Sequence, residues 1–166
     1  SVLMGNRRSG GGGSTISQQL AKSLFPRDTV SSKIPGAKYF VLGTNKLKEW
    51  ITAVKLERNY AKEEIMSMYF NAVFFGSNSY GIKAAARTFF GKHPQELNVE
   101  ESALLVGMVN MPTRYNPVRN PNLSLQRRNH VLKQMNKYGY LPDAQYDSIV
   151  KLPITLSYSK QDHNSG

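Results

Sequence analysis

The chain contains no cysteine and only three histidines among its 166 residues. Without thiols it can form neither a disulfide framework nor a thiolate metal site. His93, His130 and His163 are far apart and lack the spacing of metal ligands, which argues against a zinc site. Long apolar runs are also missing: the richest stretch, residues 103–109, has the length of a short buried helix rather than of a bilayer span.

Acidic residues are scarce. Asp and Glu number 11 against 22 Lys and Arg, and the net charge is +11. This excess predicts an anionic partner, which could be nucleic acid, an anionic membrane surface or a phosphorylated substrate. Charge alone does not choose among the three. The hydrophobic content of 40% is enough for the core of one domain of this length.

Helical periodicity runs through most of the sequence and predicts a mainly α fold. We expect helices over residues 15–24, 46–58, 62–70, 80–90, 98–111 and 122–139, and a short one from Pro142. Residues 26–44 are expected to be an irregular connection in which "KYFVL" could form a short strand, and residues 71–78 a turn. The polar composition after Pro153 predicts a domain over residues 1–153 and the start of a linker over residues 154–166. The abrupt opening suggests a fragment.

Four glycines, residues 10–13, run into Ser14 and the predicted helix start at Thr15. One interpretation is a flexible Gly-Ser spacer. The other is an anion site, because a glycine loop before a helix presents free N–H groups and the positive end of the helix dipole. The polar face formed by Thr15, Gln19 and Lys22, opposite the apolar Ile16, Leu20 and Leu24, favours an anion site. The Gly-Lys-[Ser/Thr] of a P-loop is missing.

The second candidate is Lys46 with Glu49, which lie one helical turn apart. The helix is expected to bury Leu47, Trp50, Ile51 and Val54. An ordinary surface ion pair is the simpler interpretation. Trp50, expected at the buried edge, would instead place Glu49 where a packed face meets a cleft and tune its proton affinity.

Together, four segments resemble the peptidoglycan glycosyltransferase domain of class A penicillin-binding proteins. They are "GGSTISQQLAK" (12–22), "NKLKE" (45–49), "NAVFFGSNSYGIKAAA" (71–86) and "ALLVGMVNMPTRYNP" (103–117). The third segment alone would be interpreted as structural. The resemblance implies a lysozyme-like helical fold. It also implies that the protein acts at the outer (periplasmic) face of the bacterial cytoplasmic membrane. It further implies that the enzyme lengthens glycan strands from lipid II and releases polyprenyl diphosphate.

The resemblance also assigns residues. Those implied in substrate binding are Arg8, Ser14, Thr15, Gln18, Gln19, Lys22, Lys46, Asn71, Gly76, Tyr80 and Gly81. Glu49 falls on the second glutamate of the family and is implied as a catalytic residue and a ligand of a possible divalent metal, Mg or Mn. The implied partners are lipid II, the growing glycan strand, an anionic membrane surface and a transpeptidase domain in the full-length chain, with no nucleic acid.

Two departures from the family pattern stand out. The Glu-Asp motif that supplies the general base has no counterpart here and is expected upstream of Ser1, so this chain alone should be inactive or nearly so. Asn45 stands where the motif usually has arginine, and Lys46 and Lys48 could partly compensate. Ser157-Tyr-Ser-Lys160 satisfies the Ser-x-x-Lys pattern of transpeptidases but lies in the polar tail, and we interpret it as coincidence.

Two alternatives remain open. The basic residues Arg127, Arg128, Lys133 and Lys137 on one predicted helix could belong to a nucleic-acid-binding module, but a solvated or membrane-facing surface is the favoured interpretation. A lysozyme-type hydrolase would need a pair of carboxylates around the sugar. Glu57 lies two turns from Glu49 and is expected to face elsewhere.

Overall fold

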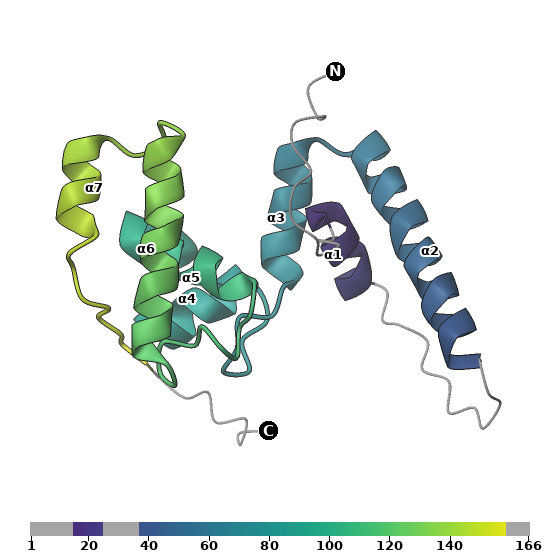
Figure 1. Ribbon diagram of the computed structural model, residues 1–166, viewed down its shortest axis with the longest axis horizontal. Coiled ribbons are helices and arrows are strands. Elements are labelled where there is room, and N and C mark those ends of the chain that lie inside the picture. The colour runs from purple at the N-terminus through teal and green to yellow at the C-terminus, as the bar shows by residue number, and fades with distance from the viewer. Residues whose placement is uncertain (1–14, 25–36, 159–166) are drawn as a thin grey trace. The chain divides into compact units, whose positions relative to one another are not determined.

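The computed structural model describes residues 15–24 and 37–158, with the side chains of residues 37–40 and 43 left aside. Every regular element in these ranges is a helix (Figure 1). The elements are α1 (Ile16–Leu24), α2 (Ala37–Asn59), α3 (Lys62–Ala72), α4 (Ile82–Phe90), the 3-10 helix η1 (Pro94–Glu96), α5 (Val99–Val109), α6 (Pro121–Lys137) and α7 (Asp143–Ile149). The predicted mainly α class is therefore confirmed.

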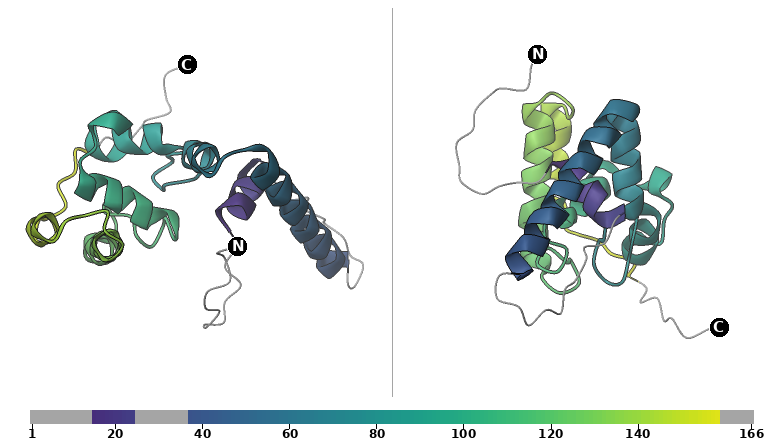
Figure 2. Two further views of the ribbon diagram at one scale, coloured as in Figure 1. Left: turned by 90° about the horizontal axis from the view of Figure 1, so that it is seen from above. Right: turned by 90° about the vertical axis from the view of Figure 1, so that its right-hand side faces the viewer.

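The chain divides into two compact units, residues 1–66 and 67–166, with the boundary inside α3. Each unit is described by itself. In the first, α1 packs against α2. In the second, α5 packs against α4 and α6, and α7 lies beside α6, as the two helices seen end-on in Figure 2 show.

Helix α2 differs from its prediction in extent and in orientation. It begins at Ala37, so the segment expected to be irregular or a short strand is helical from that residue. Its buried side carries Asn45, Glu49, Ala53 and Leu56, spaced at four, four and three residues. The apolar face predicted to be buried is largely exposed, and Trp50, expected at the buried edge, is 56% exposed. Periodicity therefore predicted the helix correctly but predicted its buried side wrongly, because apolar residues line the exposed side.

The predicted apolar stripe of α1 is also only partly correct. Leu20 is fully buried, whereas Ile16 and Leu24 are exposed. The small residues Ser17 and Ala21 are buried beside Leu20 instead. Small side chains at these positions allow a close approach of α1 to α2.

The second unit contains two adjoining apolar clusters. The first has Phe75, Ala85, Phe89, Phe90, Leu104, Leu105 and Met108 at its centre. The second joins α5, α6 and α7 through Ala103, Leu132, Leu141 and Ile149. Helix α5 contributes to both clusters, which explains why its apolar residues surround the helix rather than forming one stripe.

The helix ends in this unit follow the sequence signals. Asn98 caps α5 in a reciprocal capping box, in which its side chain accepts from the Glu101 N–H and the Glu101 carboxylate accepts from the Asn98 N–H, both at 3.0 Å. Gly91 ends α4 in the left-handed conformation at φ 66°. Pro142 is the N-cap of α7.

The segment after α7 packs back onto the first cluster through Ile154 and Leu156, and the Ser157 N–H donates to the Phe89 carbonyl at 2.9 Å. The chain is thus attached to the core as far as residue 158, four residues beyond the predicted start of the linker. The division at residue 153 stays a prediction. Within the described ranges, no helix is both long and apolar enough to span a membrane.

Candidate functional site

The polar face predicted on α1 is present. The Thr15 hydroxyl accepts a hydrogen bond from the Gln18 N–H at 3.2 Å, so Thr15 caps the helix as its spacing indicated. Thr15, Gln19 and Lys22 are all exposed, and Gln18 is half-buried. Arg8, Ser14 and the four glycines lie outside the described residues, so the predicted anion loop itself stays a prediction.

On α2, Glu49 and Lys46 form an ion pair with 3.0 Å between the Glu49 Oε2 and the Lys46 Nζ. The glutamate side chain is 6% exposed and the lysine side chain 54% exposed. The pair therefore joins the interior of the first unit to its surface: the carboxylate is held by packing, and it fixes an ammonium group that solvent still reaches. A buried partner makes this different from an ordinary pair between two mobile surface side chains.

Asn45, the residue that departs from the family pattern, is 5% exposed and lies one turn before Glu49 on the same buried side of α2. A neutral amide suits that position better than an unpaired guanidinium, because burying a charge without a partner is costly. Since α1 packs against α2, the Lys46–Glu49 pair and the polar face of α1 belong to one unit. The resemblance further predicts that Lys22, Lys46 and Glu49 share one hollow that binds the diphosphate, and this stays a prediction.

The metal expectation also stays a prediction. No group of three or more His, Asp or Glu side chains that could hold an ion occurs in the parts of the chain that the structure describes. Glu49 alone would supply one carboxylate, and Lys46 already contacts it. A magnesium ion there would need most of its oxygen ligands from a diphosphate and water, which is a common arrangement for this ion.

In the second unit, the predicted residues 71–81 form a tight hairpin. The Gly81 N–H donates to the Val73 carbonyl at 2.9 Å, and Phe74 and Tyr80 make an antiparallel bridge. Gly81 has φ 81°, and a Cβ built on it would lie 2.5 Å from the Asn71 carbonyl oxygen. The glycine thus lets the two ends of the hairpin touch, and this brings together Asn71, Tyr80 and Gly81 from the predicted set.

The Tyr80 side chain is 66% exposed, and its ring packs against Phe74 with 4.8 Å between ring centroids. Gly76, the remaining predicted residue, begins the turn at the tip of the hairpin: the Ser79 N–H donates to its carbonyl at 2.8 Å. The two residues between them, Ser77 and Asn78, have φ 47° and 61°. Two successive positive φ angles are typical of a type I′ turn, here built without glycine at either central position.

Sequence reasoning missed the residue that supports this turn. Asn116 is 3% exposed, and its Nδ2 donates to the Ser77 Oγ at 3.0 Å. Its Oδ1 accepts from the Val118 and Arg119 N–H groups at 2.9 and 3.3 Å. Two signals were present: Asn116 lies in the fourth resembling segment, residues 103–117, and the Asn-Pro pair at residues 116–117 indicates a turn. Neither signal points to a long-range partner.

Arg128 corrects the interpretation of α6 as a basic surface. Its side chain is 1% exposed, and it donates to the Leu152 carbonyl at 2.7 Å and to the Val150 and Pro153 carbonyls at 3.4 Å. Burial lowers the pKa of Arg128, and the nearby Glu100 carboxylate opposes that effect. Arg128 thus has a structural role: its hydrogen bonds hold the C-terminal segment against α6.

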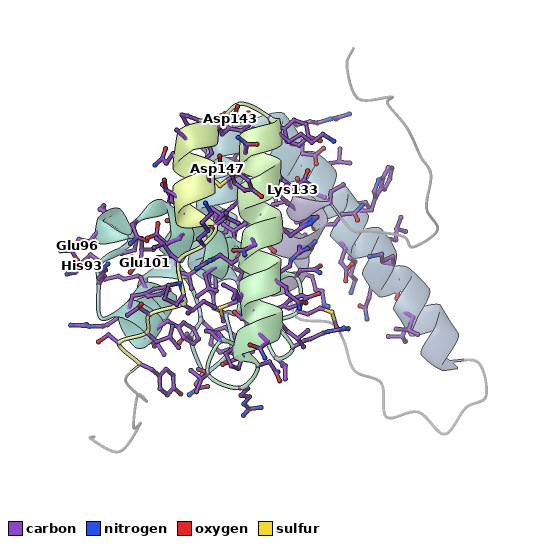
Figure 3. All side chains as sticks on the ribbon, turned by 60° about the vertical axis from the view of Figure 1, so that its left-hand side comes forward. His93, Glu96, Glu101, Lys133, Asp143 and Asp147 are labelled. Carbon is purple, nitrogen blue, oxygen red and sulfur yellow. The ribbon has the colours of Figure 1, made fainter. Side chains whose placement is uncertain are left out.

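The other three basic residues do not form one patch either. Arg127 is half-buried with its guanidinium 5.5 Å from the centroid of the Tyr115 ring. Lys133 is exposed on α6, but Asp143 and Asp147 lie on α7, the helix packed beside it (Figure 3). Lys137 lies with its Nζ 5.6 Å from the centroid of the Tyr138 ring. Carboxylates on the helix beside Lys133 disfavour a phosphate backbone there, so this surface does not support the nucleic-acid interpretation.

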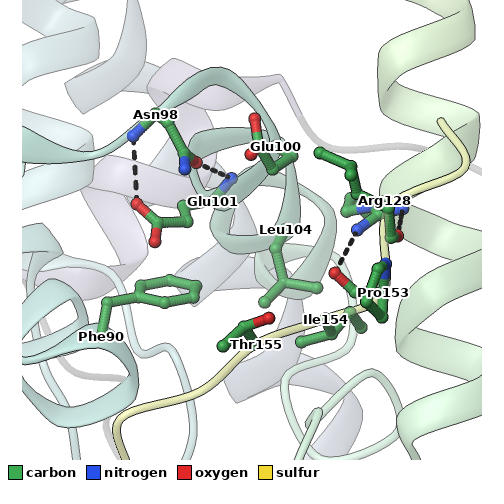
Figure 4. Close-up of a pocket in the computed structure, with 10 residues that line it drawn as sticks. Phe90, Asn98, Glu100, Glu101, Leu104, Arg128, Pro153, Ile154 and Thr155 are labelled. Atoms are coloured by element: carbon green, nitrogen blue, oxygen red, sulfur yellow. Dashed lines mark hydrogen bonds between the residues drawn. The ribbon is translucent and has the colours of Figure 1, made fainter. Parts of the chain in front are cut away.

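A cavity of about 320 Å³ lies between α4, α5, α6 and the C-terminal segment (Figure 4). Phe90, Leu104 and Ile154 form its apolar wall, and Glu100 and Arg128 lie at one end. None of the predicted site residues lines it. The Glu101 carboxylate, which also lines the cavity, already accepts from the Lys92 Nζ at 2.7 and 2.9 Å.

Comparison with known proteins supports the resemblance. Penicillin-binding protein 1A of Aquifex aeolicus is 43% identical over 146 residues, which cover 87% of this chain and 18% of the relative. The same protein of Pseudomonas aeruginosa is 37% identical over 150 residues, or 90% of this chain and 17% of the relative. The crystal structure of penicillin-binding protein 1A from Haemophilus influenzae matches with a TM-score of 0.54 and 34% identity, covering 60% of this chain and 15% of that chain.

The chain therefore spans less than a fifth of the length of these curated relatives. The family model described as Transglycosylase matches residues 2–136, which include all the predicted site residues. This match agrees with the helical, lysozyme-like fold expected from the sequence. It does not support a nucleic-acid module or a hydrolase. With most of its length matched by that model, the chain belongs to the transglycosylase family.

Proposed function

We propose that this domain is a peptidoglycan glycosyltransferase that polymerises lipid II into glycan strands. In the proposed step, the 4-hydroxyl of the acceptor glucosamine attacks the anomeric carbon of the donor muramic acid. The new glycosidic bond forms as the bond to the diphosphate oxygen breaks, with inversion at the anomeric carbon. The hydroxyl proton passes to a general base, and polyprenyl diphosphate leaves.

One observation carries the proposal: the exposed Lys46 ammonium is held 3.0 Å from the buried Glu49 carboxylate. A departing diphosphate gains negative charge as its bond breaks, and a cation already in place stabilises that charge without reorganisation. Glu49 would act by orienting Lys46. The capped start of α1, with the exposed Thr15, Gln19 and Lys22, would add further donors to the same group.

The proposed step also needs a general base to accept the hydroxyl proton. Glu49 does not suit that role, because its carboxylate is 6% exposed and already held by the Lys46 ammonium. The proposal therefore assigns Glu49 to the donor diphosphate and leaves the general base to another residue.

The proposal includes location and partners. An enzyme with this substrate would act at the outer face of the cytoplasmic membrane, beside the growing glycan strand and in one chain with a transpeptidase domain. The exposed apolar residues Leu47, Trp50 and Ile51 of α2 support an anionic membrane as the neighbouring surface, because tryptophan and aliphatic side chains beside lysines are typical of bilayer interfaces.

The test is polymerisation of lipid II by the full-length encoded protein, followed as glycan chains on gels. Lys46→Met should lower kcat/KM by about 100-fold, the scale expected for losing one preorganised donor. Glu49→Gln should lower it by about tenfold, since the amide leaves Lys46 in place but less firmly held. Lys55→Met is the matched control, because Lys55 is also an exposed lysine of α2; it should stay within about twofold of wild type.

Equal activity of Lys46→Met and Lys55→Met would refute the role of the ion pair. Shortening of added glycan strands without consumption of lipid II would instead indicate a hydrolase.

A further inference from the structure

The hairpin tip is held in a conformation that its own residues do not favour. Ser77 and Asn78 both have positive φ. This conformation costs about 1–2 kcal/mol for Ser77, whereas asparagine tolerates it better. Neither position is glycine, so the surrounding structure must maintain the turn. Strained turns of this kind are frequent at functional sites, and the strain itself directs attention to what holds it.

The turn is attached on two sides. Toward α4, the Ser79 hydroxyl donates to the Thr88 hydroxyl at 2.9 Å, and both residues are buried. Toward the loop after α5, the Asn116 Nδ2 donates to the Ser77 Oγ at 3.0 Å. Ser77 and Asn116 are 39 residues apart, so this bond is a tertiary link rather than part of the local turn.

The orientation of the Asn116 amide is determined by its other bonds. Its Oδ1 accepts from two N–H groups of its own loop, those of Val118 and Arg119, so its NH₂ group must point toward Ser77. A Cβ at Gly76 would lie 3.3 Å from the Asn116 Nδ2. The bare backbone at Gly76 thus leaves room for the amide to reach the turn.

The turn controls the position of Tyr80. The Phe75 N–H donates to the Ser79 carbonyl at 2.9 Å, and the Phe74–Tyr80 bridge follows directly. A displaced 76–79 turn would therefore displace Tyr80, whose side chain is 66% exposed. An exposed aromatic ring that carries a hydroxyl is suited to stacking on and hydrogen bonding with a saccharide.

We propose that Asn116 is a positioning residue of a saccharide-binding surface on the second unit, which acts through Ser77 to fix the 76–79 turn and so presents Tyr80 to a sugar ring of the substrate. This inference rests on the proposed function. Asn116 itself is buried and makes no contact with substrate; its effect passes through the turn.

The test uses Ser77→Gly in the full-length encoded protein. Glycine adopts positive φ without strain, so this variant removes the link to Asn116 while the turn geometry stays accessible. Asn78→Gly is the matched control, because it places glycine at the other positive-φ position of the turn and leaves the link intact. We expect Ser77→Gly to raise KM for lipid II about fivefold with little change in kcat, and Asn78→Gly to stay within about twofold of wild type.

A double-mutant cycle tests whether the effect belongs to the Ser77–Asn116 hydrogen bond alone. In the Asn116→Ala background, Ser77→Gly should raise KM no further, since the link is already absent. Equal KM values for Ser77→Gly, Asn78→Gly and wild type would overturn the inference and leave the proposed function intact. A wild-type protein that does not polymerise lipid II would overturn both.

Discussion

Replacing Gly81 by alanine tests whether the hairpin depends on backbone contact between its two ends. Gly81 has φ 81°, and a Cβ there would lie 2.5 Å from the Asn71 carbonyl oxygen, a separation that real structures avoid. Gly139 is the control, because it has nearly the same φ, 78°, and nothing lies within 4 Å of its Cβ position. Both glycines belong to the second unit, so both substitutions report on the same unfolding transition.

The magnitude follows from two separate costs. Alanine at positive φ costs about 1–2 kcal/mol at Gly139. Gly81 also has ψ 155°, a combination that glycine alone adopts readily, so its conformational cost is at least as large. The collision with Asn71 adds about 1–3 kcal/mol at Gly81 alone, because a backbone carbonyl must move. Gly139→Ala should therefore lower the free energy of unfolding by about 1–2 kcal/mol and Gly81→Ala by about 3–4 kcal/mol. The difference of about 2 kcal/mol measures the steric contact together with the glycine-specific ψ of Gly81.

Urea unfolding followed by circular dichroism measures this difference. With an m-value of about 2 kcal/mol/M for a domain of this size, the midpoints of the two variants should differ by about 1 M. Gly91→Ala supplies an intermediate geometry, with φ 66° and only an ordinary contact of 3.4 Å to the Ser157 Oγ, and should resemble Gly139→Ala. Midpoints for Gly81→Ala and Gly139→Ala within about 0.2 M of each other would refute the reasoning.

Two further predictions concern buried polar groups. Arg128→Met should lower the free energy of unfolding by about 3 kcal/mol, because the Leu152 carbonyl that accepts from Arg128 at 2.7 Å would lose its partner. The control is Arg87→Met, at an exposed arginine of α4, which should change the free energy of unfolding by less than about 0.5 kcal/mol. Equal losses in the two variants would contradict a structural role for Arg128. Burial raises the pKa of Tyr69 above 10.0. The contribution of the protonated Tyr69 to stability is therefore complete below pH 10.0 and is lost as the pH rises through the pKa of the folded state. Tyr69→Phe should reduce the fall of the thermal midpoint at alkaline pH. If the midpoints of Tyr69→Phe and wild type fall in parallel with pH, Tyr69 is not the cause.

Local signals predicted the helices of the second unit well. The Asn98–Glu101 spacing, Gly91 and Pro142 each mark an observed helix end. These features act within a few residues, so the sequence records them directly. The first unit was predicted less well, because the choice of the buried side of α2 depends on its neighbours. Apolar residues such as Trp50 lie on the exposed side, while Glu49 is buried.

The candidate site divides in the same way. The motifs identified Lys46 and Glu49, and the helical spacing predicted that they could pair. Nothing local indicated that one partner is buried and the other exposed. Asn116 was missed because its partner Ser77 lies 39 residues away, and a side-chain hydrogen bond over that distance leaves no periodic trace.

The sequence by itself determined the helical class, most helix ends and the family, and it supplied the polar residues of the candidate site as predictions, since each is recorded in composition, short spacing or motif. Only the tertiary structure decided which side of α2 is buried, that Arg128 is internal, and that a buried asparagine supports the 76–79 turn. The physical reason is that burial and long-range hydrogen bonds are properties of packed neighbours, which come together only when the chain folds.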